Sequence, residues 1–250
     1  MDEKTLAYIN LFAVLGGLSK LCELDGDCHK LIEGRDVAIG ITVKDGPEGT
    51  IHFHDGVCDV TSGVDKCDIK LPFSSCKKFN GLIDGTVTPI PSKGFTKIGF
   101  LLKQFTRLTD KLTAYLRPDP EALKDEEFFT VSTTIMFHLI LDAVAQIGSV
   151  DKIGKASASY IVDGDVRVAI EGGPEGHIHA RNHVLTAVHA PVEHPTSYMV
   201  FSSMRDARDL FDGKVNAVVC VGLGKVRIGG MISMVDNVNR ILDRVSLYLA

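Results

Sequence analysis

Alternating apolar and polar positions predict two matching strands, at residues 39–43 and 166–170. Each run leads into the tetrapeptide Gly-Pro-Glu-Gly, at residues 46–49 and at residues 173–176. Alternation with a period of two is typical of a strand with one buried face. Glycine and proline favour a turn between such runs. The pattern therefore predicts one hairpin in each half of the chain.

The two hairpins belong to a longer internal repeat. Ile51-His52 matches Ile178-His179, and residues 107–116 align with residues 240–249. Between these segments, Phe79-Asn80-Gly81 resembles Phe211-Asp212-Gly213. The repeat is longer than a solenoid unit and indicates a duplicated domain. Prolines 118 and 120 end the preceding helix, so we predict domains at residues 1–118 and 119–250.

The second copy shows the order of elements more clearly. We expect, in order, a helix over 131–148, a short helix over 153–160, strands over 165–171 and 176–182, extended segments at 184–188 and 198–201, a short helix over 204–212, an apolar run over 215–221, a strand over 225–230 and a helix over 234–249. The last helix has a wide apolar arc. It either packs into its own core or forms one wall of an apolar cavity.

Charge and cysteine content exclude several classes. The 250-residue chain has a net charge of −5 and no lysine or arginine run, so we expect no nucleic-acid partner. The acidic start differs from a secretory signal, and the apolar run over 11–18 is too short to span a bilayer. We therefore predict a cytoplasmic protein without stable membrane insertion. No Cys-x-x-Cys pair occurs among the six cysteines, which favours reduced, mostly buried thiols.

Histidine pairs follow both predicted turns. His52 and His54 share one strand face, as do His177 and His179, and such pairs can supply two metal ligands. When the two copies are aligned on their Gly-Pro-Glu-Gly turns, His52 and His179 are the only histidines of these pairs at equivalent positions. Solvent-facing histidines are therefore the preferred interpretation, and a metal-dependent enzyme is an alternative. We predict no metal and no cofactor.

Other catalytic motifs have less support. No Gly-x-Ser-x-Gly occurs, and Gly222-Leu223-Gly224 lacks the strand-before-helix context of a dinucleotide site. Cys220 lies in an apolar run, which predicts a protonated, inert thiol. We predict no catalytic residues and a protein that is not an enzyme.

Residues 211–230 carry a family resemblance. The string from Phe211-Asp212-Gly213 to Gly222-Leu223-Gly224-Lys225-Val226-Arg227-Ile228-Gly229-Gly230 resembles the sterol carrier protein 2 (SCP2) lipid-binding domain. The resemblance implies an α+β fold of two tandem domains, each a mixed, mostly antiparallel five-stranded sheet covered on one face by helices. It also implies an apolar tunnel whose walls would include Met204, Phe211, Val215, Val218, Val219, Met231, Met234, Val238, Ile241 and Val245.

The first copy departs from this pattern. Gly85, Pro89 and Pro91 occupy the segment that corresponds to the apolar run of the second copy, and two prolines cannot continue a helix there. The function implied by the resemblance is carriage of a sterol, fatty acid, acyl-CoA or similar lipid. An accessory or assembly subunit, with a protein partner or a homodimer at the apolar helix face, is the main alternative.

Overall fold

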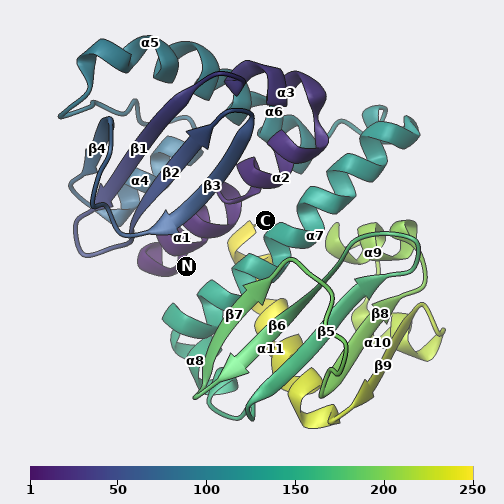
Figure 1. Cartoon of the computed structure of the whole chain (residues 1–250). Coiled ribbons are helices and arrows are strands. Elements are labelled where there is room, and N and C mark those ends of the chain that lie inside the picture. Colours follow the sequence, from purple (N-terminus) through teal and green to yellow (C-terminus); the bar gives the residue numbers. More distant parts are fainter. Residues whose placement is uncertain (250) are drawn as a thin grey trace. The chain divides into compact units, whose positions relative to one another are not determined.

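The computed structural model describes residues 1–249 and divides the chain into two compact units. The N-terminal unit comprises Asp2–Ile135 and the C-terminal unit comprises Met136–Ala250. Each unit has one mixed sheet together with helices, which makes it α+β, as predicted. Figure 1 shows the helices of each unit gathered on one face of its sheet.

Before α7 begins at Glu126, the N-terminal unit contains six α-helices and four strands. In chain order they are α1 (Glu3–Ile9), α2 (Gly17–Leu24), α3 (Gly26–Ile32), β1 (Asp36–Val43), β2 (Glu48–His54), β3 (Val57–Ser62), β4 (Ile69–Phe73), α4 (Cys76–Ile83), α5 (Ile98–Phe100) and α6 (Thr106–Leu116). Two π-helical turns, Asn10–Val14 and Leu101–Phe105, make continuous helical stretches of α1 with α2 and of α5 with α6.

The C-terminal unit follows the same plan. Its elements are α7 (Glu126–Val150), α8 (Lys152–Ala158), β5 (Gly164–Ile170), β6 (Glu175–Arg181), β7 (Val184–Val188), β8 (Ser197–Phe201), α9 (Met204–Phe211), α10 (Ala217–Gly222), β9 (Val226–Gly230) and α11 (Ile232–Leu249). Helix α7 begins before the division between the units. Its first part packs with the N-terminal unit, where Phe128 stacks on Tyr115 at 4.7 Å between ring centroids. The domain boundaries drawn from the sequence stay a prediction.

The four strands that the two sheets have in common follow the same order. The full order is β3-β2-β1-β4 in the N-terminal unit and β7-β6-β5-β8-β9 in the C-terminal unit. Both predicted hairpins are antiparallel, with Ile39 opposite Ile51 and Val166 opposite Ile178. The first strand of each hairpin also pairs in parallel, β1 with β4 and β5 with β8. The repeat seen in the sequence thus coincides with a repeat of strand connectivity.

The N-terminal sheet has four strands rather than the predicted five. In the C-terminal unit β9 pairs antiparallel with β8, whereas at the corresponding edge of β4 one isolated bridge joins Lys70 and Lys93. Pro89 and Pro91 lie just before this bridge. Proline has no N–H group to donate, so the segment cannot form a regular ladder.

The equivalence of α4 and α9 differs from the sequence alignment. Ser75 caps α4 and Ser203 caps α9, each by accepting a backbone N–H three residues later. Gly85 and Gly213 follow these helices with positive φ angles of 70° and 67°. Gly85 therefore corresponds to Gly213, and the alignment of Phe79-Asn80-Gly81 with Phe211-Asp212-Gly213 is wrong by one helical turn.

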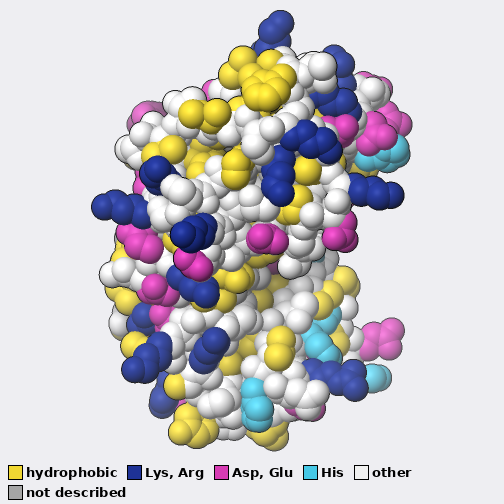
Figure 2. All heavy atoms as spheres, turned by 90° about the vertical axis from the view of Figure 1, so that its left-hand side faces the viewer, with side chains coloured by type: hydrophobic (Ala, Val, Ile, Leu, Met, Phe, Trp, Pro, Cys, Tyr) yellow, Lys and Arg dark blue, Asp and Glu magenta, His cyan; other side chains and the backbone are white. Residues whose placement is uncertain are grey.

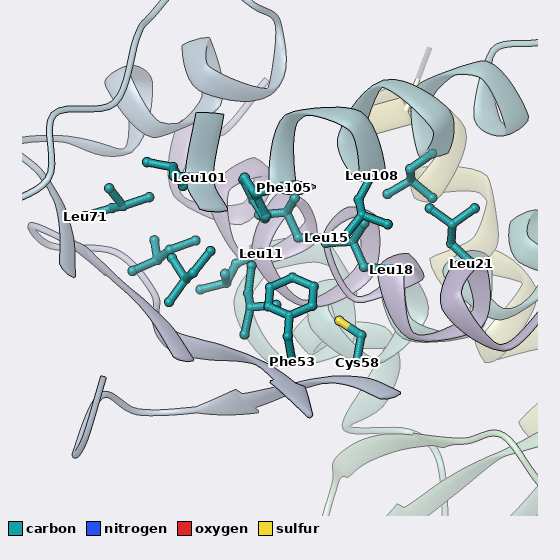
Figure 3. Close-up of a cluster of buried hydrophobic side chains, with 14 of the residues drawn as sticks. Leu11, Leu15, Leu18, Leu21, Phe53, Cys58, Leu71, Leu101, Phe105 and Leu108 are labelled. Atoms are coloured by element: carbon teal, nitrogen blue, oxygen red, sulfur yellow. The ribbon is translucent and has the colours of Figure 1, made fainter. Parts of the chain in front are cut away.

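Each core lies between the sheet and its helices. In Figure 3, leucines 11, 15, 18 and 108 project toward Phe53 of β2 in the N-terminal unit. In the helices that end the two repeats, Leu108 and Leu112 correspond to Ile241 and Val245, and all four are buried. Complete burial of one such aliphatic side chain contributes about 1.5–3 kcal/mol. The repeated stripe on α6 and α11 therefore serves first as core.

Two helical stretches, Glu3–Leu24 and Glu126–Val150, are long and apolar enough to cross a membrane by length and composition. More than half of each apolar window is buried, at 61% and 56%. Burial of this kind also fits a core helix of a folded domain.

Candidate functional site

The ten residues predicted to line a tunnel divide into three groups. Four of them, Met234, Val238, Ile241 and Val245, lie on α11 and are buried in the core. This placement is that of a helix packed into its own core, one of the two interpretations left open by the sequence. Ligand contact by these side chains would require displacement of what covers them.

The second group lies around α9. Met204, Phe211 and Val215 are half-buried. The ring of Phe211 packs against Phe201 of β8, with the ring centroids 5.5 Å apart. Phe211 thus contacts the C-terminal sheet through β8.

The third group is exposed. Val218 has 77% of its surface exposed, Val219 has 54% and Met231 has 43%. The expectation that Val218 and Val219 face into an enclosed tunnel is corrected: they point to solvent. Their role in ligand binding stays a prediction, because exposed side chains can still contact a ligand at the surface.

Helix α10 exposes most of its apolar side chains. It is six residues long, it begins at the cap Asn216, and Cys220 is its one fully buried residue. Val221 and Leu223 are exposed together with Val218 and Val219. We call these four residues the α10 patch. Contiguous exposed aliphatic side chains mark binding surfaces more often than scattered ones do.

The sequence pattern missed Val221 and Leu223 because residues 217–221 are all apolar. With no polar residue to define a period, the pattern could not show which face of the helix is buried. In the structure, the side chain of Cys220 marks the buried face of the helix. The Cys220 carbonyl also accepts a hydrogen bond from the Lys225 backbone N–H, at 2.9 Å.

Helix α10 is a short segment with one buried side chain, Cys220. The helix lies between Gly213 and Gly224, which have φ angles of 67° and 72° in the left-handed region that favours glycine. It sits at the β8–β9 end of the sheet (Figure 1). Short segments with little buried apolar surface open more easily than core helices.

Ion pairs flank the α10 patch on both sides in the sequence. Before it, Lys214 Nζ lies 2.8 Å from Asp212 Oδ2 and 3.7 Å from Asp209 Oδ1. After it, Lys225 Nζ lies 2.8 Å from Asp206 Oδ1. Hydrogen bonds from Lys225 and Ser203 lower the pKa of Asp206. The lysines that flank the patch in the sequence are thus already paired with carboxylates.

The predicted histidine pairs do share strand faces. His179 Nδ1 lies 2.8 Å from Asp165 Oδ1, and His177 Nε2 lies 3.8 Å from the same oxygen. In the N-terminal unit, His52 Nε2 contacts Thr61 Oγ1 at 3.2 Å, and His54 lies 3.9 Å from Asp36. Within residues 1–249, no group of three or more His, Cys, Asp or Glu side chains is arranged to hold a metal ion.

A second titratable cluster was not predicted. His189 Nε2 lies 2.9 Å from Asp142 Oδ1 on α7, and the imidazole rings of His138 and His189 are 4.4 Å apart between centroids. Burial raises the pKa of Asp142, and the contact with His189 partly offsets that effect. His138 and Asp142 are four residues apart on one helix, a spacing the sequence offers, but His189 comes from a distant loop.

An open cleft of about 430 Å³ lies in the N-terminal unit. Its lining mixes charges of both signs around the first turn of α4: Asp2, Glu3, Lys4, Lys44, Asp45, Ser74, Ser75, Cys76 and Lys77. Burial raises the pKa of the Cys76 thiol, which keeps it protonated and poorly nucleophilic. On the face seen in Figure 2, basic and acidic side chains are likewise intermixed.

No family model matches the chain, and no curated protein matches it. Parts of the chain are similar to solved structures. One is the UbiJ-SCP2 ubiquinone synthesis protein, which is 13% identical and has a TM-score of 0.34. The match covers 42% of this chain and 95% of that chain. Sterol carrier protein 2 like 2 from Aedes aegypti is 8% identical, with a TM-score of 0.30. That match covers 41% of this chain and 92% of the Aedes aegypti chain.

A third solved structure is the stereoselective inverting sec-alkylsulfatase Pisa1 from Pseudomonas sp., with 11% identity and a TM-score of 0.32. The match covers 58% of this chain but 28% of that protein. All three TM-scores lie below 0.5, so the function proposed for this chain rests on its own residues.

Proposed function

We propose that the C-terminal unit binds a hydrophobic small molecule at the α10 patch, without catalysis. The observation that carries this proposal is the exposure of four aliphatic side chains on and next to a helix that buries little else. Water around such side chains is released when an apolar molecule covers them. The interaction needs no reacting group and no bound metal.

The energy available is sufficient for useful affinity. Burying about 300 Å² of apolar ligand surface contributes about 7 kcal/mol before ordering costs. The half-buried Phe211 and Val215, which precede α10 in the chain, would add apolar contact if α10 moved. The glycines on both sides of α10 allow such a movement with little backbone strain.

The N-terminal unit lacks a comparable surface at the same place. Residues 84–94 form no helix, and the exposed Ile90 lies between two prolines. We therefore propose one binding site per chain, in the C-terminal unit.

Native mass spectrometry after incubation with cis-9-octadecen-1-ol tests the proposal. The wild type should retain one alcohol molecule per chain. Val218→Asp should lose it, because the carboxylate would be desolvated against the alkyl chain. Leu247→Asp is the matched control, since Leu247 is an exposed aliphatic residue of the same unit outside the α10 patch. Equal retention by both variants would contradict the proposal.

A protein partner is the second candidate occupant, because exposed apolar side chains also mark subunit interfaces. The same samples distinguish the two. A dimer that Val218→Asp dissociates, with no alcohol retained by the wild type, would assign the α10 patch to an interface between copies of this chain.

A further inference from the structure

The charges around the α10 patch bear on which hydrophobic ligands it accepts. Lys214 and Lys225 flank the patch in sequence, and both are paired with carboxylates. Arg208, on α9, is almost completely buried and lies 2.8 Å from Asp212. Arg205, beside it, is engaged as well. A ligand carboxylate or phosphate placed beside the patch would meet cations that already have partners.

An anionic head group at either lysine would therefore have to share the ammonium group with the carboxylate it already holds, or draw it away from that carboxylate. The lysine that turned to the ligand would leave Asp206, or Asp209 and Asp212, close to the new negative charge. Like charges held close together destabilise a complex. An uncharged polar group, such as a hydroxyl or a carbonyl, requires no such exchange and can be hydrogen-bonded by water at the rim.

We infer that the ligand of the α10 patch is an uncharged hydrophobic molecule, such as an alcohol, a ketone or an ester, rather than a fatty acid anion or a phosphorylated lipid. This inference rests on the proposed function of the same patch. It selects among the lipid classes by charge complementarity and adds the prediction that the ion pairs at Lys214 and Lys225 set the selectivity.

A tryptophan reporter makes the comparison direct. The chain contains no tryptophan, so Leu223→Trp places a single indole in the α10 patch. Its emission should shift to shorter wavelength as an apolar ligand covers it. Titration with cis-9-octadecen-1-ol and with cis-9-octadecenoate, matched in chain length and double bond, compares a neutral with an anionic head group. We expect the alcohol to bind about tenfold more tightly at pH 8, where the acid is ionised.

Asp206→Asn in the reporter background releases Lys225, and Asp209→Asn loosens the hold on Lys214. Each should raise the affinity for octadecenoate relative to the alcohol.

Asp206 also lies in the first turn of α9, so Asp209→Asn provides a second variant if Asp206→Asn lowers the melting temperature. Alcohol binding with equal or tighter binding of octadecenoate would overturn the inference while leaving the proposed function intact. No change in the affinity ratio in either variant would also overturn it. Failure of both ligands to bind would overturn the proposed function and the inference together.

Discussion

Tyr248 donates a hydrogen bond to Asp151 across 97 residues of sequence, with 2.7 Å between the hydroxyl and Oδ2. Asp151 also accepts the first free N–H groups of α8 and a hydrogen bond from Arg244. The N-terminal unit repeats the arrangement: Tyr115 donates to Asp25 at 2.9 Å, and Asp25 caps α3. In each unit one carboxylate thus connects the last helix with an early helix.

Removing the Tyr248 hydroxyl should destabilise the C-terminal unit. Tyr248→Phe leaves the ring in place but removes one hydrogen bond to a buried, charged acceptor, which should cost about 1.5–3 kcal/mol. Urea unfolding followed by circular dichroism measures the change. Tyr160→Phe, at an exposed tyrosine of the same unit, is the control and should leave the free energy of unfolding unchanged. Equal stability of the two variants would contradict a structural role for the hydrogen bond.

Both repeated aspartates should make stability dependent on acid pH. Burial alone raises the pKa of Asp151, but hydrogen bonds from Arg244, from the Gly154 N–H and from Tyr248 outweigh it, so the pKa is lowered. The pKa of Asp25 is lowered in the same way, against the effect of burial, by hydrogen bonds from Cys28 and Tyr115 and by Lys111. A depressed folded pKa stabilises the fold above the unfolded value of about 3.9.

That contribution is lost as pH falls through the folded pKa values. We expect the free energy of unfolding to decrease below about pH 4. Asp151→Asn should lower stability at pH 7 and flatten this acid limb. If Asp151→Asn instead shows the same slope as the wild type, the lowered pKa contributes nothing to acid sensitivity.

Asp142 should behave in the opposite sense. Its raised pKa means that the protonated form favours folding below about pH 4, and this contribution is lost as pH rises through the folded pKa. Asp142→Asn should therefore gain stability relative to the wild type between pH 4 and pH 7. His189→Ala should lose stability at pH 7, because it leaves the half-buried carboxylate without its imidazole partner. A relative stability of Asp142→Asn that stays constant over this range would contradict the expectation.

Thiol reactivity should separate the cysteines into two groups. Burial raises the pKa of the Cys28 thiol to about 12. A hydrogen bond with Cys22, together with burial, raises the pKa of the Cys58 thiol. A disulfide reagent at pH 8 should react in the folded chain with Cys67 and, more slowly, with Cys76, because both are partly exposed but burial raises the pKa of the Cys76 thiol. The remaining four should react after unfolding in urea. Rapid modification of all six without denaturant would show that the N-terminal core opens readily.

The sequence predicted the elements that have a regular period or a repeat. The hairpins at 39–54 and 166–181 follow from alternation and turn residues, the duplication follows from the repeated strings, and the apolar stripe of α11 follows from helical spacing. Pro89 and Pro91, which exclude a helix in this segment, also exclude a regular fifth strand, because proline has no N–H group to donate to the ladder. Alignment of Gly81 with Gly213 failed because similar short strings occur one helical turn apart.

The candidate site was less predictable. Identifying the α10 patch requires knowing that Cys220 points inward, and a run of apolar residues has no polar neighbour to show this. The ion pairs of Lys214 and Lys225 join residues whose pairing depends on how α9 turns into α10. The His138, Asp142 and His189 cluster depends in the same way on the path of the loop that follows β7.

The most direct test of ligand binding by the α10 patch compares two variants, each with a single tryptophan. Leu223→Trp puts an indole in the patch, and Leu247→Trp puts one at another exposed aliphatic position of the same unit. Titration with cis-9-octadecen-1-ol should give a saturable emission shift to shorter wavelength, at one ligand per chain, in Leu223→Trp alone. An unchanged spectrum in Leu223→Trp, or an equal shift in both proteins, would contradict hydrophobic ligand binding at α10.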